Sequence, residues 1–98
     1  MHTFSTHLTF IEDPGHGWLK VPLAELDVLG IRGQITPYSY INGEYAYLEE
    51  DVDAGTYLDA RTAQQVPAPT IDQEYVHAFA GRTQYDRFPS PAKQEGER

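Results

Sequence analysis

The sequence predicts one α+β domain with a mostly antiparallel sheet and two short helices, in the order β-β-α-β-β-α-β. Three observations predict this fold class. Residues 3–11 alternate between apolar and polar side chains, as a half-buried strand does. Asn42-Gly43 lies between two runs of β-branched and aromatic residues, which is typical of a tight hairpin. Apolar side chains recur at helical spacing between residues 22 and 29 and again after Asp53.

The first half of the domain begins with a strand over residues 3–11. The following segment, 13–17, holds two glycines and a proline and is predicted to turn. Residues 18–21 form an extended run that can pair with the first strand. Residues 22–29 are predicted to form a helix, since proline is favourable in a first turn and leucines recur every third residue. Gly30 is placed for a left-handed cap at the end of this helix.

The hairpin fixes which side chains share a face. With Asn42 and Gly43 as a two-residue type I′ loop, Tyr40 faces Tyr45 and Tyr38 faces Tyr47. Because side chains alternate across a strand, one face then carries only tyrosines and the other carries aliphatic and small residues. The tyrosine face consists of Tyr38, Tyr40, Tyr45 and Tyr47, and the other face of Ile35, Ser39, Ile41, Ala46 and Leu48. The pattern leaves open which of the two is exposed.

The second half is predicted to start with a helix. Either Asp51 or Asp53 can cap it, because a carboxylate accepts hydrogen bonds from the free N–H groups of a first turn. The helix continues to about residue 65 and is followed by a proline-rich connector. Residues 71–79 alternate as a last strand. We expect residues 1–80 to form the domain and residues 81–98 to form a poorly ordered tail.

The charge of the chain restricts its partners. Fifteen acidic residues against seven basic ones give a net charge of −8. This charge disfavours direct binding to nucleic acid or to an anionic membrane and favours a basic partner. The chain has no cysteine, which excludes disulfides and thiolate metal sites. No signal peptide and no apolar run of about 20 residues is visible, so we expect a cytoplasmic protein of the host cell.

His16 is the residue most like a catalytic one, because it lies between Gly15 and Gly17 and imidazole is the usual acid–base group at neutral pH. The alternative is that His16 and Trp18 hold a tight turn together. No nucleophile stands at a recognisable spacing, so we expect no enzyme and no catalytic residue. The four histidines have no paired spacing and the acidic positions near Gly55 lack a distal glutamate, so we expect neither metal nor cofactor.

An acidic segment runs from Glu44 to Asp59, with no lysine or arginine before Arg61. Its members are Glu44, Glu49, Glu50, Asp51, Asp53 and Asp59. A row of carboxylates can imitate the charge spacing of a nucleic-acid backbone, since arginine binds carboxylates and phosphates with similar geometry. The segment can equally be a solvated helix cap and a charged strand end that discourages edge pairing.

Four blocks of the sequence carry a family resemblance. They are residues 13–21 (DPGHGWLKV), 29–31 (LGI), 38–40 (YSY) and 47–54 (YLEEDVDA). In these blocks the chain resembles a group of small phage and plasmid proteins of uncharacterised activity. The resemblance covers about half of the chain and implies an accessory gene of a mobile element.

Charge and resemblance together favour a stoichiometric inhibitor of a host defence nucleoprotein, an anti-CRISPR or anti-restriction protein. It would act as a DNA mimic, as monomer or homodimer, by binding the partner's basic nucleic-acid site. The expected partner-binding residues are Tyr38, Tyr40, Glu44, Tyr45, Tyr47, Glu49, Glu50, Asp51 and Asp53. One alternative is a small enzyme or ligand-binding module that uses the Gly15-His16-Gly17-Trp18 turn. Another is a structural or regulatory subunit that pairs an edge strand.

Overall fold

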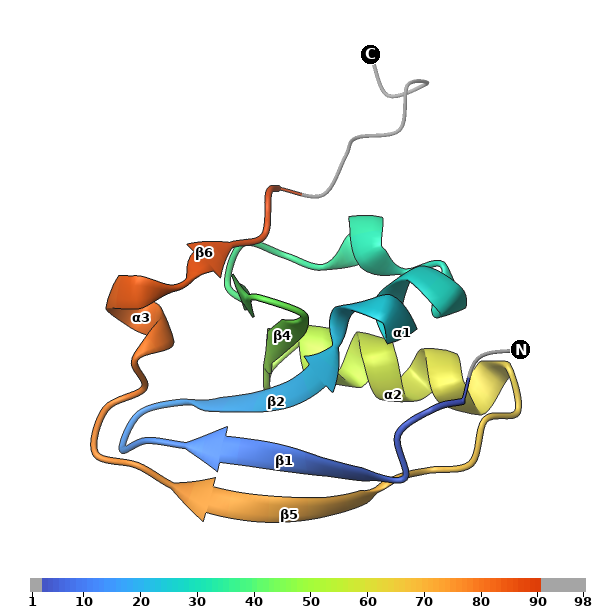
Figure 1. Ribbon diagram of the computed structural model, residues 1–98, viewed down its shortest axis with the longest axis horizontal. Helices are drawn as coiled ribbons and strands as arrows, with labels where there is room; N and C mark the ends of the chain where they lie inside the picture. Colours follow the sequence, from blue (N-terminus) through green and yellow to red (C-terminus); the bar gives the residue numbers. More distant parts are fainter. Residues whose placement is uncertain (1–2, 91–98) are drawn as a thin grey trace.

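The computed structural model describes residues 3–90 and has one mixed sheet of six strands (Figure 1). The strands are β1 His7–Glu12, β2 Gly17–Pro22, β3 Tyr40–Asn42, β4 Tyr45–Glu49, β5 Thr70–Tyr75 and β6 Asp86–Arg87. They lie in the order β5-β1-β2-β4-β3-β6, and β1–β5 is the parallel pair in an otherwise antiparallel sheet. The predicted α+β class is confirmed.

Two helices, α1 Leu23–Leu29 and α2 Asp53–Ala63, pack on one face of the sheet. Two shorter elements were not predicted: the 3₁₀ turn η1 Arg32–Gln34 and the single-turn helix α3 Gly81–Gln84. Figure 1 shows α3 at the opposite end of the sheet from α1. No helix in residues 3–90 combines the length and apolarity needed to cross a bilayer.

The C-terminus of α1 is capped as predicted. Gly30 has a φ of 77°, and its N–H donates to the carbonyl of Asp27 at 3.1 Å. The N–H of Ile31 donates to the carbonyl of Leu26 at 3.0 Å, and the buried Ile31 side chain closes the end of the helix. This is the arrangement in which glycine is preferred, because a side chain strains a left-handed residue.

The start of α2 differs from the prediction, because neither Asp51 nor Asp53 caps it. Instead, the Glu49 carboxylate accepts from the N–H of Asp51 at 2.7 Å and from the N–H of Val52 at 3.1 Å. The Asp53 side chain points into the domain. A residue at the end of β4 therefore orders the turn that leads into the helix.

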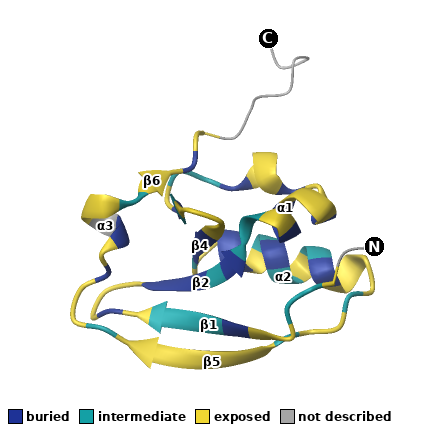
Figure 2. Ribbon diagram, viewed as in Figure 1, coloured by how far each residue is buried: buried dark blue, intermediate teal, exposed yellow. Residues whose placement is uncertain are grey.

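The sheet buries a different cluster on each face, and its inner strand β2 is largely buried (Figure 2). Because side chains alternate along β2, Leu19 and Val21 join the aliphatic core under α1 and α2, whereas Trp18 points to the other face. That second face holds an aromatic cluster of Trp18, Tyr40, Tyr47 and Phe79, in which the rings of Trp18 and Phe79 stack at 4.1 Å.

Phe79 reaches this cluster because the last long strand is shorter than predicted. The expected strand over residues 71–79 ends at Tyr75, and residues 76–80 cross to the aromatic face. Tyr85 packs on the same cluster, and Phe88 is 2% exposed in the aliphatic core. The expectation of a poorly ordered tail is therefore wrong for residues 81–90, because they form α3, β6 and part of the core. Its remainder, 91–98, lies outside the described residues.

The hairpin pairs in a different register from the predicted one. Tyr40 faces Tyr47 and Asn42 faces Tyr45, which leaves Gly43 and Glu44 as the loop. Gly43 has a φ of 63°, whereas Glu44 is not among the described residues with positive φ, as in a type II′ turn. The slip is by two residues, so each side chain keeps its predicted face. The new register places Ile41 beside Ala46 on the core side.

The two glycines Gly43 and Gly55 provide a matched test of backbone conformation. Gly43→Ala is expected to lower the free energy of unfolding by about 1 kcal/mol, because alanine is strained at positive φ. Gly55→Ala is expected to raise it by about 0.8 kcal/mol, since a Cβ there meets nothing within 4 Å and alanine favours the helix. Urea unfolding of both variants measures the difference. Equal effects of the two changes would contradict the assigned loop.

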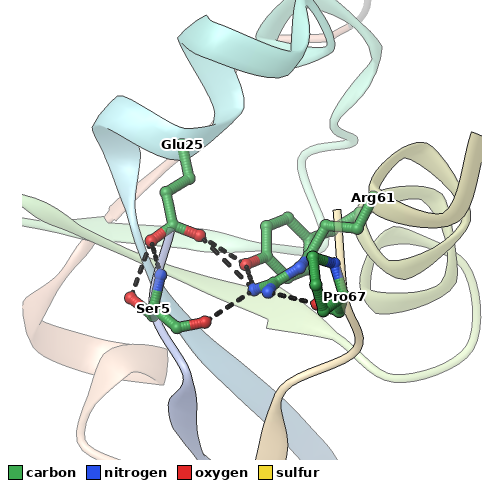
Figure 3. A network of polar contacts seen from close by, with 5 residues as sticks. Ser5, Glu25, Arg61 and Pro67 are labelled. Carbon is green, nitrogen blue, oxygen red and sulfur yellow. Dashed lines mark hydrogen bonds and ion pairs between the residues drawn. The ribbon is translucent and has the colours of Figure 1, made fainter. Parts of the chain in front are cut away.

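A buried ionic network lies between α1, α2 and the chain before β1 (Figure 3). Glu25 is 1% exposed and Arg61 3%, and their closest charged atoms are 3.8 Å apart. The Glu25 carboxylate also accepts from the N–H and hydroxyl of Ser5 and from the Tyr57 hydroxyl. Arg61 donates to Tyr57 Oη and to the carbonyls of Ser5 and Pro67. The network joins elements that are distant in sequence.

Candidate functional site

A cleft of about 520 Å³ opens on the aromatic face at the end of β4. Its lining residues are His16, Trp18, Tyr38, Tyr40, Glu49, Asp51, Val52 and Arg87. Trp18 and Tyr40 are buried and form an aromatic floor, whereas Tyr38 is 68% exposed at the rim. The cleft therefore joins the His16 turn to part of the acidic segment, two features that the sequence places far apart.

The turn that carries His16 is held by Asp13. The Asp13 carboxylate accepts from the N–H groups of Gly15 and His16 at 3.0 and 2.9 Å. Its second oxygen accepts from the N–H of Phe79 at 3.2 Å, which ties the turn to the segment over the aromatic cluster. The His16 ring stacks on Trp18 at 5.7 Å, and its Nδ1 lies 4.0 Å from Asp13.

The glycines beside His16 differ in their surroundings. A Cβ on Gly15 would meet nothing within 4 Å, whereas a Cβ on Gly17 would collide with the Phe10 ring. Gly17 therefore allows Phe10 to pack against the start of β2, and its missing side chain serves internal packing. The turn presents His16 itself, not a bare backbone, to the cleft.

Two carboxylates, Glu49 and Asp51, and one guanidinium, Arg87, line the cleft. Arg87 is occupied within the protein, since it donates to the carbonyl of Pro37 at 2.9 Å and to Tyr40 Oη at 3.2 Å. Glu49 accepts two backbone N–H groups, which leaves lone pairs free because a carboxylate has about four acceptor positions. Because both of these partners are neutral, the Arg87 charge remains in the cleft, and two carboxylates against one guanidinium leave a net negative charge beside aromatic rings.

We compared the chain with protein-family models, with curated proteins and with solved structures. None of the three comparisons gives a match. The cleft must therefore be interpreted from its own chemistry.

The structure divides the predicted partner-binding residues between different places. Tyr38, Tyr40, Glu49 and Asp51 meet at the cleft. Glu44 and Tyr45 are exposed at the other end of β4, roughly 13 Å along the strand from Glu49. Tyr45 is covered on one side by Lys20, whose Nζ lies 4.4 Å from the ring centre.

Glu50 lies next to Glu49 in sequence but not in space. Glu49 lines the cleft on the aromatic face, and Glu50 lines a second, more apolar groove beside α2 and β5. Neighbouring residues at a strand end point to opposite faces, so consecutive acids cannot form one row. The expected continuous surface of carboxylates is not present.

Three of the predicted residues are buried. Asp53 is 0% exposed, and its carboxylate accepts from the N–H and hydroxyl of Thr36 and from the Ser39 hydroxyl. Tyr40 and Tyr47 belong to the aromatic cluster under Phe79. The expectation of a partner-binding side chain is therefore wrong for Asp53, because the fold uses its charge internally, and Tyr40 contributes only to the cleft floor.

Burial of Tyr47 predicts an alkaline transition. Desolvation, with the neighbouring Tyr85, raises the pKa of Tyr47 to about 12 from an ordinary value of 10. Between these values the unfolded chain loses the phenolic proton and the folded chain keeps it, so the free energy of unfolding falls as the pH rises from 10 to 12. Tyr47→Phe should reduce this fall, measured by urea unfolding at stepped pH, and the part that remains is expected from Tyr57, whose pKa burial also raises. An unchanged slope would contradict the burial.

Sequence patterns could not indicate two of the cleft residues. In the sequence, Val52 is an apolar residue without a distinctive pattern around it, and Arg87 lies in the expected tail. Arg87 reaches the cleft because Tyr40 pairs with it across β3 and β6. Among residues 3–90, no group of three or more histidines and acids is arranged to hold a metal ion.

Proposed function

We propose that this protein is a non-enzymatic inhibitor that docks on a basic surface of a host nucleoprotein and receives a cationic side chain in the cleft. The observation that carries this proposal is the pairing of Glu49 and Asp51 with an aromatic floor and the Tyr38 rim. Carboxylates attract arginine and lysine by charge, and the exposed Tyr38 ring can add a cation–π contact, whereas Arg87 already lies 5.1 Å from the centre of the Tyr40 ring. The net charge of −8 favours approach to such a partner.

We infer the class of partner from the resemblance of four sequence blocks between residues 13 and 54 to small phage and plasmid proteins, a resemblance for which the comparisons give no match. Accessory proteins of mobile elements benefit from blocking host defence, so the proposed target is a CRISPR complex or a restriction enzyme. The protein would compete with nucleic acid for one or two key arginines of the target's nucleic-acid site. It does not copy a long run of phosphates, because the acidic segment is divided between faces.

Binding of arginine itself tests the cleft. A blocked arginine-containing peptide, titrated into isotopically labelled protein and followed by NMR, should shift the signals of His16, Trp18 and Val52. A peptide with citrulline in place of arginine has nearly the same shape without the charge and should shift them at least about tenfold less. The arginine effect should weaken with added salt.

A pair of double variants separates the site from net charge. Glu49→Gln with Asp51→Asn should abolish arginine binding and inhibition of DNA cleavage by the target. Glu44→Gln with Asp59→Asn removes the same charge elsewhere on the surface and should leave both intact. The proposal fails if the two double variants behave alike, or if inhibition survives loss of both cleft carboxylates.

A second candidate function is a ligand-binding or catalytic use of His16. The Asp13 carboxylate 4.0 Å from Nδ1, on a turn at the mouth of the cleft, is the observation that favours it. The described lining residues contain no serine, threonine, cysteine or lysine, so the hydroxyls available there are those of Tyr38 and Tyr40. If His16→Gln abolishes biological activity while arginine binding persists, this second function is favoured over cation capture.

A further inference from the structure

The outer edge of β5 pairs with no other strand in residues 3–90. β5 ends the sheet on one side, and all six of its residues are exposed (Figure 2). The opposite edge is β6, which has two residues. A long strand with one unpaired edge is a template for the addition of another strand.

Hydrogen bonds to β1 identify which backbone groups face outward. The N–H of Thr70 donates to Thr6 and that of Val76 to Glu12, both at 2.8 Å. Backbone groups of alternate residues point to opposite edges, so the even-numbered positions of β5 bond to β1. The N–H and C=O groups of Ile71, Gln73 and Tyr75 therefore point away from the sheet.

The two faces of β5 have different chemistry. Asp72 and Glu74 lie on the aromatic side of the sheet, where Asp72 is 4.0 Å from His7 Nδ1. Ile71 and Tyr75 lie on the helix side and are 39% and 63% exposed. Ile71 borders a groove of about 370 Å³, lined mainly by Phe10, Leu19, Ala54 and Leu58. An added strand would meet acids on one face and an apolar groove on the other.

A second copy of this chain does not suit the edge. In a two-fold antiparallel pair, opposite side chains lie on the same face. Pairing centred on residue 72, 73 or 74 would place Asp72 against itself, Asp72 against Glu74, or Glu74 against itself. Like charges directly opposite one another destabilise a sheet, so this strand disfavours its own duplication.

We propose that the β5 edge binds an extended segment of a basic partner protein, in which lysine or arginine alternates with apolar residues. The basic side chains would pair with Asp72 and Glu74, and the apolar ones would enter the groove beside Ile71. Glu50 at the groove rim adds further negative charge. This surface is separate from the cleft, because the two sets of lining residues have no member in common. It does not depend on the proposed function.

The probe is a blocked peptide of alternating lysine and valine that matches the six residues of β5, compared with one of alternating glutamate and valine. NMR amide exchange on the full chain should show at least about tenfold slower exchange at Ile71, Gln73 and Tyr75 with the lysine peptide only. Gln73→Pro removes one outward N–H and should abolish the effect, whereas Gln73→Ala should keep it.

A charge exchange provides a test that leaves the backbone intact, should the proline variant fail to fold. Asp72→Lys with Glu74→Lys should weaken binding of the lysine peptide by about tenfold and strengthen binding of the glutamate peptide. Equal binding of both peptides to the wild type would overturn the proposal. So would shifts confined to the cleft, or protection of the same amides by self-association without peptide.

Discussion

Glu25→Ala is expected to lower the free energy of unfolding by about 3–5 kcal/mol, because it leaves the buried Arg61 charge uncompensated. The loss also removes the acceptor for Ser5 and for the Tyr57 hydroxyl. A domain of this size is stable by about 5–15 kcal/mol in total, so this loss is a large share of its stability. Urea unfolding and thermal melting measure the effect, with an expected fall in Tm of more than about 10 °C.

The control for Glu25 is an exposed ion pair between Asp27 of the same helix and Arg32 of η1. Asp27 and Arg32 are 3.1 Å apart, with side chains 54% and 46% exposed. Because solvent screens this pair, Asp27→Ala should cost less than about 1 kcal/mol. If the two alanine variants lose similar stability, the network in Figure 3 is not the stabilising feature that its burial indicates.

Asp53→Ala is expected to cost about 3–5 kcal/mol, since three donors of Thr36 and Ser39 lose their acceptor in the interior. The Ser39 hydroxyl in turn accepts the Glu49 N–H at 2.9 Å, so the change reaches the end of β4. Asp53→Asn keeps one acceptor oxygen and should cost about 2 kcal/mol. Urea unfolding of the two variants measures both losses of stability.

Asp51→Ala is the matched control for Asp53, two residues away on the surface. An exposed carboxylate without internal partners contributes little, and the expected change is within about 0.5 kcal/mol. The two substitutions should therefore have different effects: the change at Asp53 lowers stability, and the change at Asp51 lowers arginine binding. A stable Asp53→Ala variant that loses arginine binding would instead assign Asp53 to the cleft.

The stretches with regular periodicity were predictable from sequence. Residues 22–29 gave the helix α1 and its cap at Gly30, and the alternation around Asn42 gave the two faces of the hairpin. The register was not predictable, because both Asn42-Gly43 and Gly43-Glu44 satisfy a two-residue turn. The structure has the second, in which Ile41 faces Ala46.

The candidate site was predictable only in part. The sequence predicts Tyr38, Tyr40, Glu49 and Asp51 as binding residues and offers His16 as an alternative; all five line one cleft. Nothing in the sequence distinguishes Asp53 from Asp51, although one is buried and the other exposed. That difference arises because Thr36 and Ser39, brought close by the chain before β3, supply hydrogen bonds only at the first turn of α2.

The amino-acid sequence by itself determined the class of fold, the order of its main elements and the negative charge of the chain, because these depend on local periodicity and composition. Only the tertiary structure decided which acids remain available to a partner. It buries Asp53, sends Glu49 and Glu50 to opposite faces, and brings His16 and Arg87 to the same cleft. Burial and convergence depend on contacts between residues far apart in the chain, and no local pattern encodes them.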